Sequence, residues 1–445
     1  MERNAMLELV EWKQSARRKP LIIKGARQVG KTWLIKEFGK RYYEKYFYFN
    51  FDEEEQLHSV FQSNKDPHRI IQLLGLISEH KIEPEKHLII FDEVQECPEA
   101  LNALKYFYEN ANEYHVISAG SLLGTLLAQP KSYPVGKVNI LYLNPLTFEE
   151  FLQAVKPALY EYYCEIHRDS KIEDIFHERL MEMYRLYLII GGMPECVLNW
   201  IETEDAAVVN KIQGELIALY ENDFSKHNGK VNSGRILMVF RSIVTQLAKD
   251  NKKFVYGCIR EGARAREFEE AIEWLVSAGM ILRTYNVSKA QYPIKTYEEL
   301  NHFKLYLFDV GILKHMAGIS NQSIILKKDY QFSGALAENY VIQQLQGVYE
   351  IEPHYYAPTS NEEIDLVIQD GMNIIPGEIK AGESIRSNAF HRYMKKISVK
   401  RRFGIVDLAI RRMRCYIIFL CILLGRRRNY WKKVKSVKEG YGEIL

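Results

Sequence analysis

Short apolar runs alternate with amphipathic segments over the first third of the chain. Three such runs are PLIIK at 20–24, HLIIF at 87–91 and YHVISA at 114–119. Runs of this length indicate strands that are buried on both faces, as in a parallel sheet. The residues from Trp33 to about Lys40 have helical periodicity. The pattern predicts an α/β domain over residues 1–150.

The next part of the chain has a helical pattern. Residues 150–230 carry apolar and charged positions at helical spacing, and Gly191, Gly192 and Pro194 interrupt them. We therefore predict a helical segment over residues 151–230 that packs beside the first domain.

Residues 231–315 predict a different unit, in which three helices are followed by two strands. The helices are expected at 236–247, 257–261 and 264–277, and the strands at 280–285 and 303–308. Three helices and a hairpin indicate a winged helix, whose third helix would be the DNA reader. Arg264 and Arg266 open that helix, but glutamates follow, and an acidic helix binds a phosphate backbone poorly. The charges favour a protein-contacting or architectural winged helix over a DNA reader.

Candidate chemistry begins at the loop after the first strand. Residues 25–32 read GARQVGKT, which is G-x-x-x-x-G-K-[ST] in a strand–loop–helix setting. The two glycines let backbone N–H groups turn toward phosphates, and the helix N-terminus adds a positive dipole. Lys31 is expected to reach the β- and γ-phosphates of ATP, and Thr32 to bind Mg²⁺. The predicted ATP-binding residues are Gly25, Gln28, Gly30, Lys31 and Thr32.

A second element supports this interpretation. The second apolar run ends in Asp92 and Glu93. Asp92 is expected to hold Mg²⁺ through water, and Glu93 to polarise the water that attacks the γ-phosphate. Alternatively, both residues cap the helix near Pro98. Ser118 and Ser121, at the end of the third run, are candidates to sense the γ-phosphate, or they form a simple turn.

These motifs occur together with two later segments. The four segments read GARQVGKT, LIIFDEVQECP, YLNPLTFEEFL and YLIIGGMPECV. As a set they resemble prokaryotic AAA-family ATPases that carry a C-terminal domain of unknown function, and the resemblance extends over residues 11–380. It implies ATP binding, with Lys31 and Thr32 as the Walker A pair. Asp92 and Glu93 match the Walker B pair of the family.

One position departs from that family. A glycine–arginine pair usually precedes the proline–leucine segment, whereas this chain has Gly136-Lys137. Lysine lacks the guanidinium fork that a role of such an arginine would need. The sequence places no arginine finger, and Arg185 and Arg241 are the candidates for one.

Four charged residues form a second group near the C-terminus. They are Glu338 on an amphipathic helix, Asp365 on a short strand, and Glu378 and Lys380 as Glu-x-Lys on the next strand. The arrangement resembles the PD-(D/E)xK nuclease fold, here over residues 325–403. Asp365, Glu378 and Glu338 would bind a divalent cation, and Lys380 would position or deprotonate the attacking water. Alternatively, the fold survives as a binding or assembly platform.

Composition narrows the class of protein. With 445 residues, of which 47% are hydrophobic and 26% charged, the chain is expected to be a soluble, cytoplasmic protein of several domains. Its first residues lack the apolar region of a signal peptide. The cysteines form no CxxC pair, which indicates reduced thiols and gives no support for a zinc site. The apolar run at 415–424 is too short for a membrane-spanning helix, which needs about 20 residues.

The charge of the chain is unevenly distributed. Residues 386–445 carry 17 lysines and arginines against 3 acidic residues, while the whole chain has a net charge of +3. A basic end on an acidic body meets nucleic acid or anionic lipid, or it is a solvated tail. Beyond about residue 403 the family resemblance fades, which indicates a lineage-specific tail over 404–445 or a shifted reading frame.

The sequence thus predicts an α/β multidomain protein with a P-loop NTPase parallel sheet, a helical segment, a winged helix and an α+β nuclease-like domain. The predicted function is that of a Mg²⁺-dependent ATPase acting as a nucleotide-driven switch. The alternatives are an ATP-controlled metal-dependent nuclease or DNA-binding protein, and a non-catalytic, nucleotide-gated scaffold. The expected cofactors are ATP and Mg²⁺. DNA or a protein is the expected partner, oligomerisation stays open, and no membrane span is expected.

Overall fold

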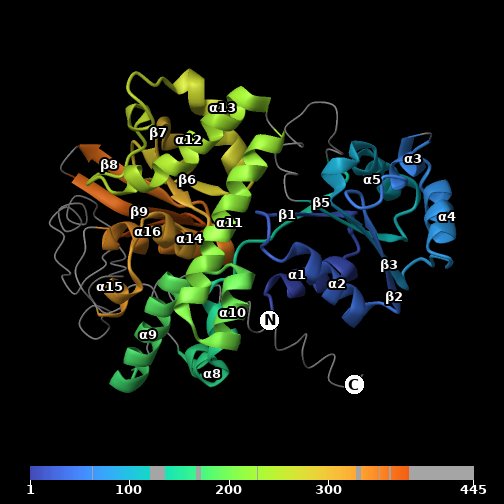
Figure 1. The fold of residues 1–445 in the computed structure, drawn as a ribbon, viewed down its shortest axis with the longest axis horizontal. Coiled ribbons are helices and arrows are strands. Elements are labelled where there is room, and N and C mark those ends of the chain that lie inside the picture. The colour runs from blue at the N-terminus through green and yellow to red at the C-terminus, as the bar shows by residue number, and fades with distance from the viewer. Residues whose placement is uncertain are drawn as a thin grey trace. The chain divides into compact units, whose positions relative to one another are not determined.

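The computed structural model describes most of the chain as far as Ile379. The described residues are 1–62, 64–120, 136–166, 172–227, 229–326, 332–349, 351–359 and 362–379. Ser121, Lys380 and the predicted tail over 404–445 lie outside them. The described residues form two compact units: Met1–Leu146 with Glu269–Met280, and Thr147–Phe268 with the described residues from Ile281 on (Figure 1). No helix among these residues is both long and apolar enough to cross a membrane.

A five-stranded parallel sheet forms the centre of the first unit. Its strands, in spatial order, are β2 (Lys45–Asn50), β3 (His87–Asp92), β4 (His115–Ala119), β1 (Leu21–Lys24) and β5 (Asn139–Tyr142). The predicted parallel α/β sheet is therefore confirmed. Because the strands are parallel, the loops that follow β1, β3 and β4 leave the sheet at the same edge.

Helices pack on this sheet through side chains that alternate along the strands. The helices of the unit are α1 (Ala5–Gln14), α2 (Lys31–Tyr42), α3 (Leu57–Gln62), α4 (Pro67–Ile77) and α5 (Pro98–Asn110), with a short 3₁₀ turn, η1, at Val94–Glu96. Phe47 and Phe49 of β2 join one buried apolar cluster with residues of α3, α4 and α5. Tyr46 points to the opposite face, because a Cβ on Gly39 of α2 would lie 2.9 Å from its side chain.

The second unit combines many helices with a second sheet. Its helices are α7 (Phe148–Val155), α8 (Pro157–Glu165), α9 (Asp174–Ile190), α10 (Pro194–Thr203), α11 (Ala206–His227), α12 (Gly229–Leu247), α14 (Val310–Met316), α15 (Asn321–Ile325) and α16 (Ser333–Tyr349). Helix α13 (Ala265–Ser277) begins in this unit. The segment predicted to be helical, 151–230, is helical over most of its described length. The predicted domain limits themselves stay a prediction.

The sheet of the second unit joins a hairpin to a three-stranded meander. The strands, in spatial order, are β10 (Asn373–Gly377), β9 (Glu362–Asp370), β8 (His354–Thr359), β6 (Ile281–Val287) and β7 (Glu298–Leu307). A parallel bridge between Asn286 and Tyr355 links the two parts, and the Asn286 side chain accepts a hydrogen bond from the Ala357 N–H at 3.0 Å. The predicted hairpin therefore continues into a larger sheet, and the winged helix stays a prediction.

A buried carboxyl group ties the helices of this unit together. Asp309 accepts hydrogen bonds from the backbone N–H groups of Ile312 at 3.0 Å and Gly192 at 2.6 Å, and one from the Gln343 side chain at 3.4 Å. Gly191 ends α9 with φ 77° and ψ −168°, a backbone region that is nearly confined to glycine. A Cβ there would lie 2.2 Å from the Asp309 carboxylate. The Gly-Gly break at 191–192 is thus required by packing as well as by the chain turn.

Replacing Gly191 by alanine should therefore destabilise the protein strongly. We expect a loss of about 3–5 kcal/mol in the free energy of unfolding, because backbone strain adds to a clash with the buried carboxylate. Gly318→Ala is the matched control, since Gly318 also has a positive φ (65°) but nothing lies within 4 Å of its added Cβ. Denaturant titration of both variants measures the difference, and equal losses would contradict the clash.

The stability of the protein should also depend on pH through Asp309. Burial raises the pKa of Asp309 to about 6 from an ordinary value of 3.8, against the opposing effect of its backbone hydrogen bonds. The carboxyl group of Asp309 binds its proton more tightly in the folded state than in the unfolded state. Its contribution to the free energy of unfolding is therefore complete below about pH 4 and is lost as the pH rises through about 6. The difference in pKa corresponds to at most about 3 kcal/mol.

The measurement compares the wild type with Asp309→Asn between pH 4 and 7. The stability of the wild type relative to this variant should fall as the pH rises through the window. Asp250→Asn removes an exposed carboxylate and should keep the wild-type pH profile. A difference that stays flat, or that rises with pH, would show that Asp309 is ionised throughout.

Candidate functional site

The loop after β1 has the backbone geometry that its glycines predict. Gly25, Gln28 and Gly30 have φ values of 153°, 63° and 92°. A Cβ on Gly25 would lie 2.1 Å from the Leu143 carbonyl oxygen, so only glycine fits against the chain that follows β5. Gly30 is the N-cap of α2, and the helix dipole therefore begins inside the loop.

Lys31 is buried within this loop. Its ammonium group donates to the carbonyl oxygens of Gly25 and Ala26, each at 2.9 Å. Burial lowers the pKa of Lys31 to about 8, although the negative charges of Glu93 and Asp92 oppose the shift. No carboxylate among the described residues forms an ion pair with it. A buried ammonium group whose hydrogen bonds go to carbonyl oxygens is suited to bind an anion.

Thr32 joins this loop to the acidic end of β3. Its hydroxyl donates to Asp92 Oδ2 at 2.7 Å, and the Glu93 N–H donates to Asp92 Oδ1 at 3.0 Å. The two predicted motifs therefore meet. Glu93 precedes η1 and Cys97 precedes α5, and neither side chain forms a capping hydrogen bond. The alternative that Asp92 and Glu93 cap the helix near Pro98 is therefore not supported by a capping hydrogen bond.

Two further side chains form hydrogen bonds with the carboxylates of Asp92 and Glu93. Tyr48 of β2 donates to Asp92 Oδ2 at 2.9 Å, and Gln95 Nε2 donates to Glu93 Oε2. Glu93 has φ 49°, a left-handed conformation that is uncommon outside glycine and marks functional turns. The sequence analysis missed Tyr48. The alternation of apolar and polar residues along β2 was the available signal.

Ser118 lies on β4, between the strands that carry the two motifs. It is opposite Ile22 on one side and Phe91 on the other. Its hydroxyl is fully buried and forms no hydrogen bond with any described residue. Because paired residues of a parallel sheet share a face, Ser118 lies on the face of Ile22 and Phe91, which belong to the apolar cluster, and not on the face of Asp92. A role of Ser118 as sensor of the γ-phosphate stays a prediction. Ser121, the second candidate, lies outside the described residues.

Two of the remaining positively charged candidates, Lys137 and Arg241, pair with carboxylates. Lys137 forms an ion pair with Glu109 at 3.1 Å. Arg241 donates twice to Glu221, at 2.8 and 2.7 Å. Nothing in the described contacts assigns Arg185 or Arg241 the role of an arginine finger.

Magnesium and a triphosphate fit these groups. A hydroxyl and a carboxylate are hard oxygen donors of the kind that Mg²⁺ prefers, and they already lie in contact. The loop supplies backbone N–H groups, a helix N-terminus and a buried ammonium group for phosphate oxygens.

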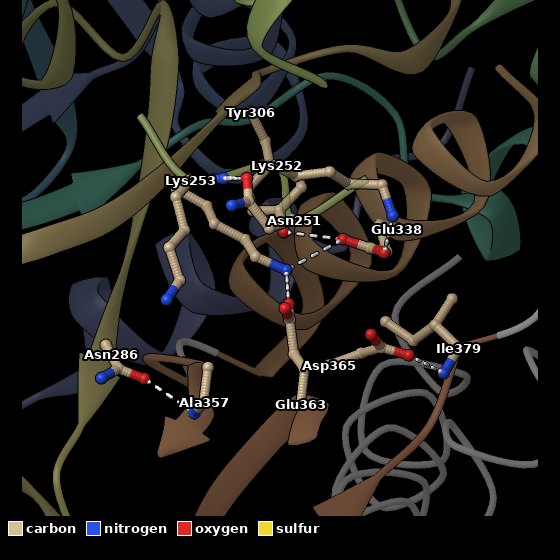
Figure 2. Close-up of polar contacts among 11 residues, drawn as sticks. Asn251, Lys252, Lys253, Asn286, Tyr306, Glu338, Ala357, Glu363, Asp365 and Ile379 are labelled. Carbon is tan, nitrogen blue, oxygen red and sulfur yellow. Dashed lines mark hydrogen bonds and ion pairs between the residues drawn. The ribbon is translucent and has the colours of Figure 1, made fainter. Parts of the chain in front are cut away.

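A second charged group, which we call the Glu338 cluster, lies in the other unit (Figure 2). Its members are Glu338 of α16, Lys304 and Tyr306 of β7, Glu363 and Asp365 of β9, and Lys252 of the loop after α12. Glu338 is buried and accepts a hydrogen bond from Lys252 and one from the Tyr306 hydroxyl at 3.0 Å. Lys304 lies 3.5 Å from Glu338 and 2.5 Å from Glu363.

Charge and burial perturb the titration of this cluster. Burial, followed by the negative charges of Glu338 and Glu378, raises the pKa of Asp365 to about 7. Burial alone would raise the pKa of Glu338 as well, but the charges of Lys304 and Lys252 lower it. Asp365 also accepts a hydrogen bond from the Ile379 N–H at 2.9 Å. The structure thus brings three of the four predicted acidic and basic positions into mutual influence.

The predicted metal site there is not complete in what the structure describes. No group of three or more metal-ligating side chains close enough to hold an ion occurs among the described residues. Lys380 lies outside them. Lys304 and Lys252, which the sequence analysis missed, occupy the neighbourhood of Glu338 instead. A lysine within the apolar run 303–308 was the signal for the first of them.

Comparisons with known proteins agree with the geometry of the first unit. Residues 17–152 match the family described as an AAA domain. Residues 181–323 and 333–410 match domains of unknown function, DUF8612 and DUF4143. Residues 17–152 are thus similar to AAA domains, and their parallel sheet and loop fit a P-loop NTPase fold. The two later matches name no activity. No curated protein matches the chain.

Solved structures resemble the chain only distantly. The Walker-type ATPase of Pyrococcus abyssi is 14% identical, with 71% of this chain and 95% of that chain covered and a TM-score of 0.45. DnaA of Aquifex aeolicus, bound to AMPPCP, is 13% identical over 73% and 93% of the chains, with a TM-score of 0.27. ORC1 of Aeropyrum pernix, in complex with DNA, is 12% identical over 72% and 92%, with a TM-score of 0.26.

Proposed function

We propose that this protein is a Mg²⁺-dependent ATPase that acts as a nucleotide-driven switch. The observation that carries the proposal is the hydrogen bond from Thr32 to Asp92, which brings the phosphate-binding loop and the acidic strand end into one site. Lys31 directly precedes Thr32 in the sequence, and Glu93 directly follows Asp92. The AAA match over residues 17–152 supports the same class.

Each residue has a separate task in this mechanism. The backbone of residues 25–30 and the Lys31 ammonium group bind and orient the β- and γ-phosphates. The Thr32 hydroxyl donates its hydrogen to Asp92, so the lone pairs of its oxygen stay available for the metal. When bound, Mg²⁺ neutralises charge that develops on the phosphate oxygens.

Glu93 is the proposed base for water attack. Its hydrogen bond from Gln95 orients the carboxylate, and its backbone is left-handed, with φ 49°. Glu93 would accept the proton of the attacking water as its oxygen bonds to the γ-phosphorus. The bond from that phosphorus to the β–γ bridging oxygen would break, and ADP would leave with the electron pair.

The proposed switch rests on the burial of the Lys31 ammonium group. A bound triphosphate would supply an anionic partner for this buried charge, so it would favour the nucleotide-bound arrangement. Nucleotide binding would then stabilise one arrangement of the loop and of the strand ends around it. The proposed location is the cytoplasm, and the proposed partner is another protein or DNA.

Turnover of ATP by two variants tests the proposal. Lys31→Ala should abolish Mg²⁺·ATP binding, because it removes the phosphate-binding ammonium group. Glu93→Gln should retain binding and lower the rate of phosphate release by roughly 10²–10⁴-fold, the usual contribution of a general base. Glu96→Gln, an exposed neighbour in the same turn, is the control and should behave as the wild type. Phosphate release and nucleotide binding are measured on the full chain, with and without DNA.

The outcomes separate the switch from a scaffold. Wild-type protein that binds no ATP would end the proposal. Binding that requires Lys31 without any turnover would favour a non-catalytic scaffold that is gated by nucleotide. Turnover that rises with DNA would make DNA the partner.

The Glu338 cluster favours a second candidate function, that of a metal-dependent nuclease. Two ammonium groups there face the three carboxyl groups of Glu338, Glu363 and Asp365, and Glu378 raises the pKa of Asp365 further. Carboxylate oxygens are the ligands that a divalent cation such as Mg²⁺ prefers, and Glu338 among them is buried. The PD-(D/E)xK resemblance supplies the reaction class, hydrolysis of a phosphodiester.

Cleavage of plasmid DNA and of RNA in Mg²⁺ or Mn²⁺ tests this candidate. Asp365→Asn should reduce cleavage to background while ATP affinity is unchanged, because the two sites lie in different units. Asp370→Asn, at the end of the same strand, should cleave as the wild type does. Cleavage that persists in Asp365→Asn would come from a contaminant.

A further inference from the structure

Tyr48 lies on the face of the sheet that carries the nucleotide site. Side chains alternate along β2, so Phe47 and Phe49 enter the apolar cluster with α3, α4 and α5. Tyr46 lies on the opposite face, against Gly39 of α2. Tyr48 is two residues on and therefore shares this face. It is opposite Ile90 on β3, and Asp92 is two residues beyond Ile90 on the same face.

The contacts of Tyr48 hold its hydroxyl on one carboxylate oxygen. The phenol donates to Asp92 Oδ2 at 2.9 Å. The ammonium group of Lys36, on α2, lies 3.5 Å from the centroid of the ring and fixes its plane through a cation–π contact. Burial, followed by the negative charge of Asp92, raises the pKa of Tyr48. The phenol therefore stays neutral and remains a donor at any physiological pH.

The hydrogen bonds of Asp92 nearly exhaust its acceptor capacity. A carboxylate offers about four lone-pair positions. Thr32 and Tyr48 occupy those of Oδ2, and the Glu93 N–H occupies one on Oδ1. One acceptor position therefore remains among the described contacts, and it belongs to Oδ1. A metal-bound water would therefore donate to an Asp92 carboxylate whose orientation is already fixed by these hydrogen bonds.

We propose that Tyr48 is a positioning residue for magnesium, holding the Asp92 carboxylate in the orientation that accepts a metal-bound water. The inference rests on the proposed ATPase function and assigns a task that neither sequence motif contains. Thr32 and Tyr48 both donate to Oδ2, but the Thr32 oxygen would also be a ligand of the metal. Tyr48 has no such second task, so its hydrogen bond would hold Oδ2 whether or not the metal is bound.

Removal of the hydroxyl should appear in the magnesium dependence of nucleotide binding. Asp92 in Tyr48→Phe keeps its charge but loses a charge-assisted hydrogen bond, so we expect the half-saturating Mg²⁺ concentration for ATP binding to rise about three- to tenfold. Affinity for ATP in EDTA should be unchanged, because Lys31 and the loop backbone are untouched. The binding of a fluorescent ATP analogue to the full chain, titrated with Mg²⁺, measures both values without any turnover.

Matched variants identify the cause. Tyr46→Phe removes a hydroxyl on the same face of the same strand that forms no hydrogen bond with a described residue, so it should match the wild type. Lys36→Met removes the cation over the ring and should give a smaller rise than Tyr48→Phe. A merely structural role of Tyr48 would weaken binding in EDTA as much as in Mg²⁺.

Each result decides one question. Wild-type protein that fails to bind the analogue would overturn the proposed function and with it this inference. Wild-type binding with a half-saturating Mg²⁺ concentration that is unchanged or lower in Tyr48→Phe would overturn only the role of Tyr48. A rise that is confined to the Mg²⁺-dependent measurement supports it.

Discussion

The hydrogen bond between Thr32 and Asp92 is the contact on which the candidate site depends. It spans 60 positions of sequence and joins the loop after β1 to the end of β3. Strand β4 lies between those two strands, so the contact requires a parallel sheet whose strand ends lie at one edge. Ser118 stands at the same edge because β4 ends there too. A single sheet order thus brings together residues that carry no local signal of their proximity.

The second unit depends on buried polar groups instead. Asn339 exchanges two hydrogen bonds with the Leu307 backbone, and Gln343 and Gln344 of the same helix both donate to the Tyr187 hydroxyl. Such groups are expensive to bury unless every donor and acceptor is matched, so they fix one arrangement of the helices rather than adding much net stability. The Glu338 cluster extends this pattern to full charges, where removal of one partner leaves another uncompensated.

The sequence was informative where short-range chemistry dictates the backbone. The apolar runs at 20–24, 87–91 and 114–119 became β1, β3 and β4, and the glycines of GARQVGKT took the positive φ angles that phosphate loops need. The apolar-run pattern did not identify β2 and β5. Side chains of β2 point alternately into the apolar cluster and to the opposite face, so β2 lacks a continuous apolar run. Strand β5 is a short edge strand with exposed side chains.

Sequence alone determined the identity and spacing of the groups proposed to contact phosphate and metal, because the glycine-rich loop and the acidic strand end are each encoded by contiguous residues. Tertiary structure alone decided which distant side chains orient those groups. Tyr48 reaches Asp92 because β2 pairs with β3 in one register. Lys304 of β7 reaches Glu338 because α16 packs against β7, and Lys252 reaches it from the loop after α12. Strand order and register arise from the packing of the whole core, which no local pattern contains.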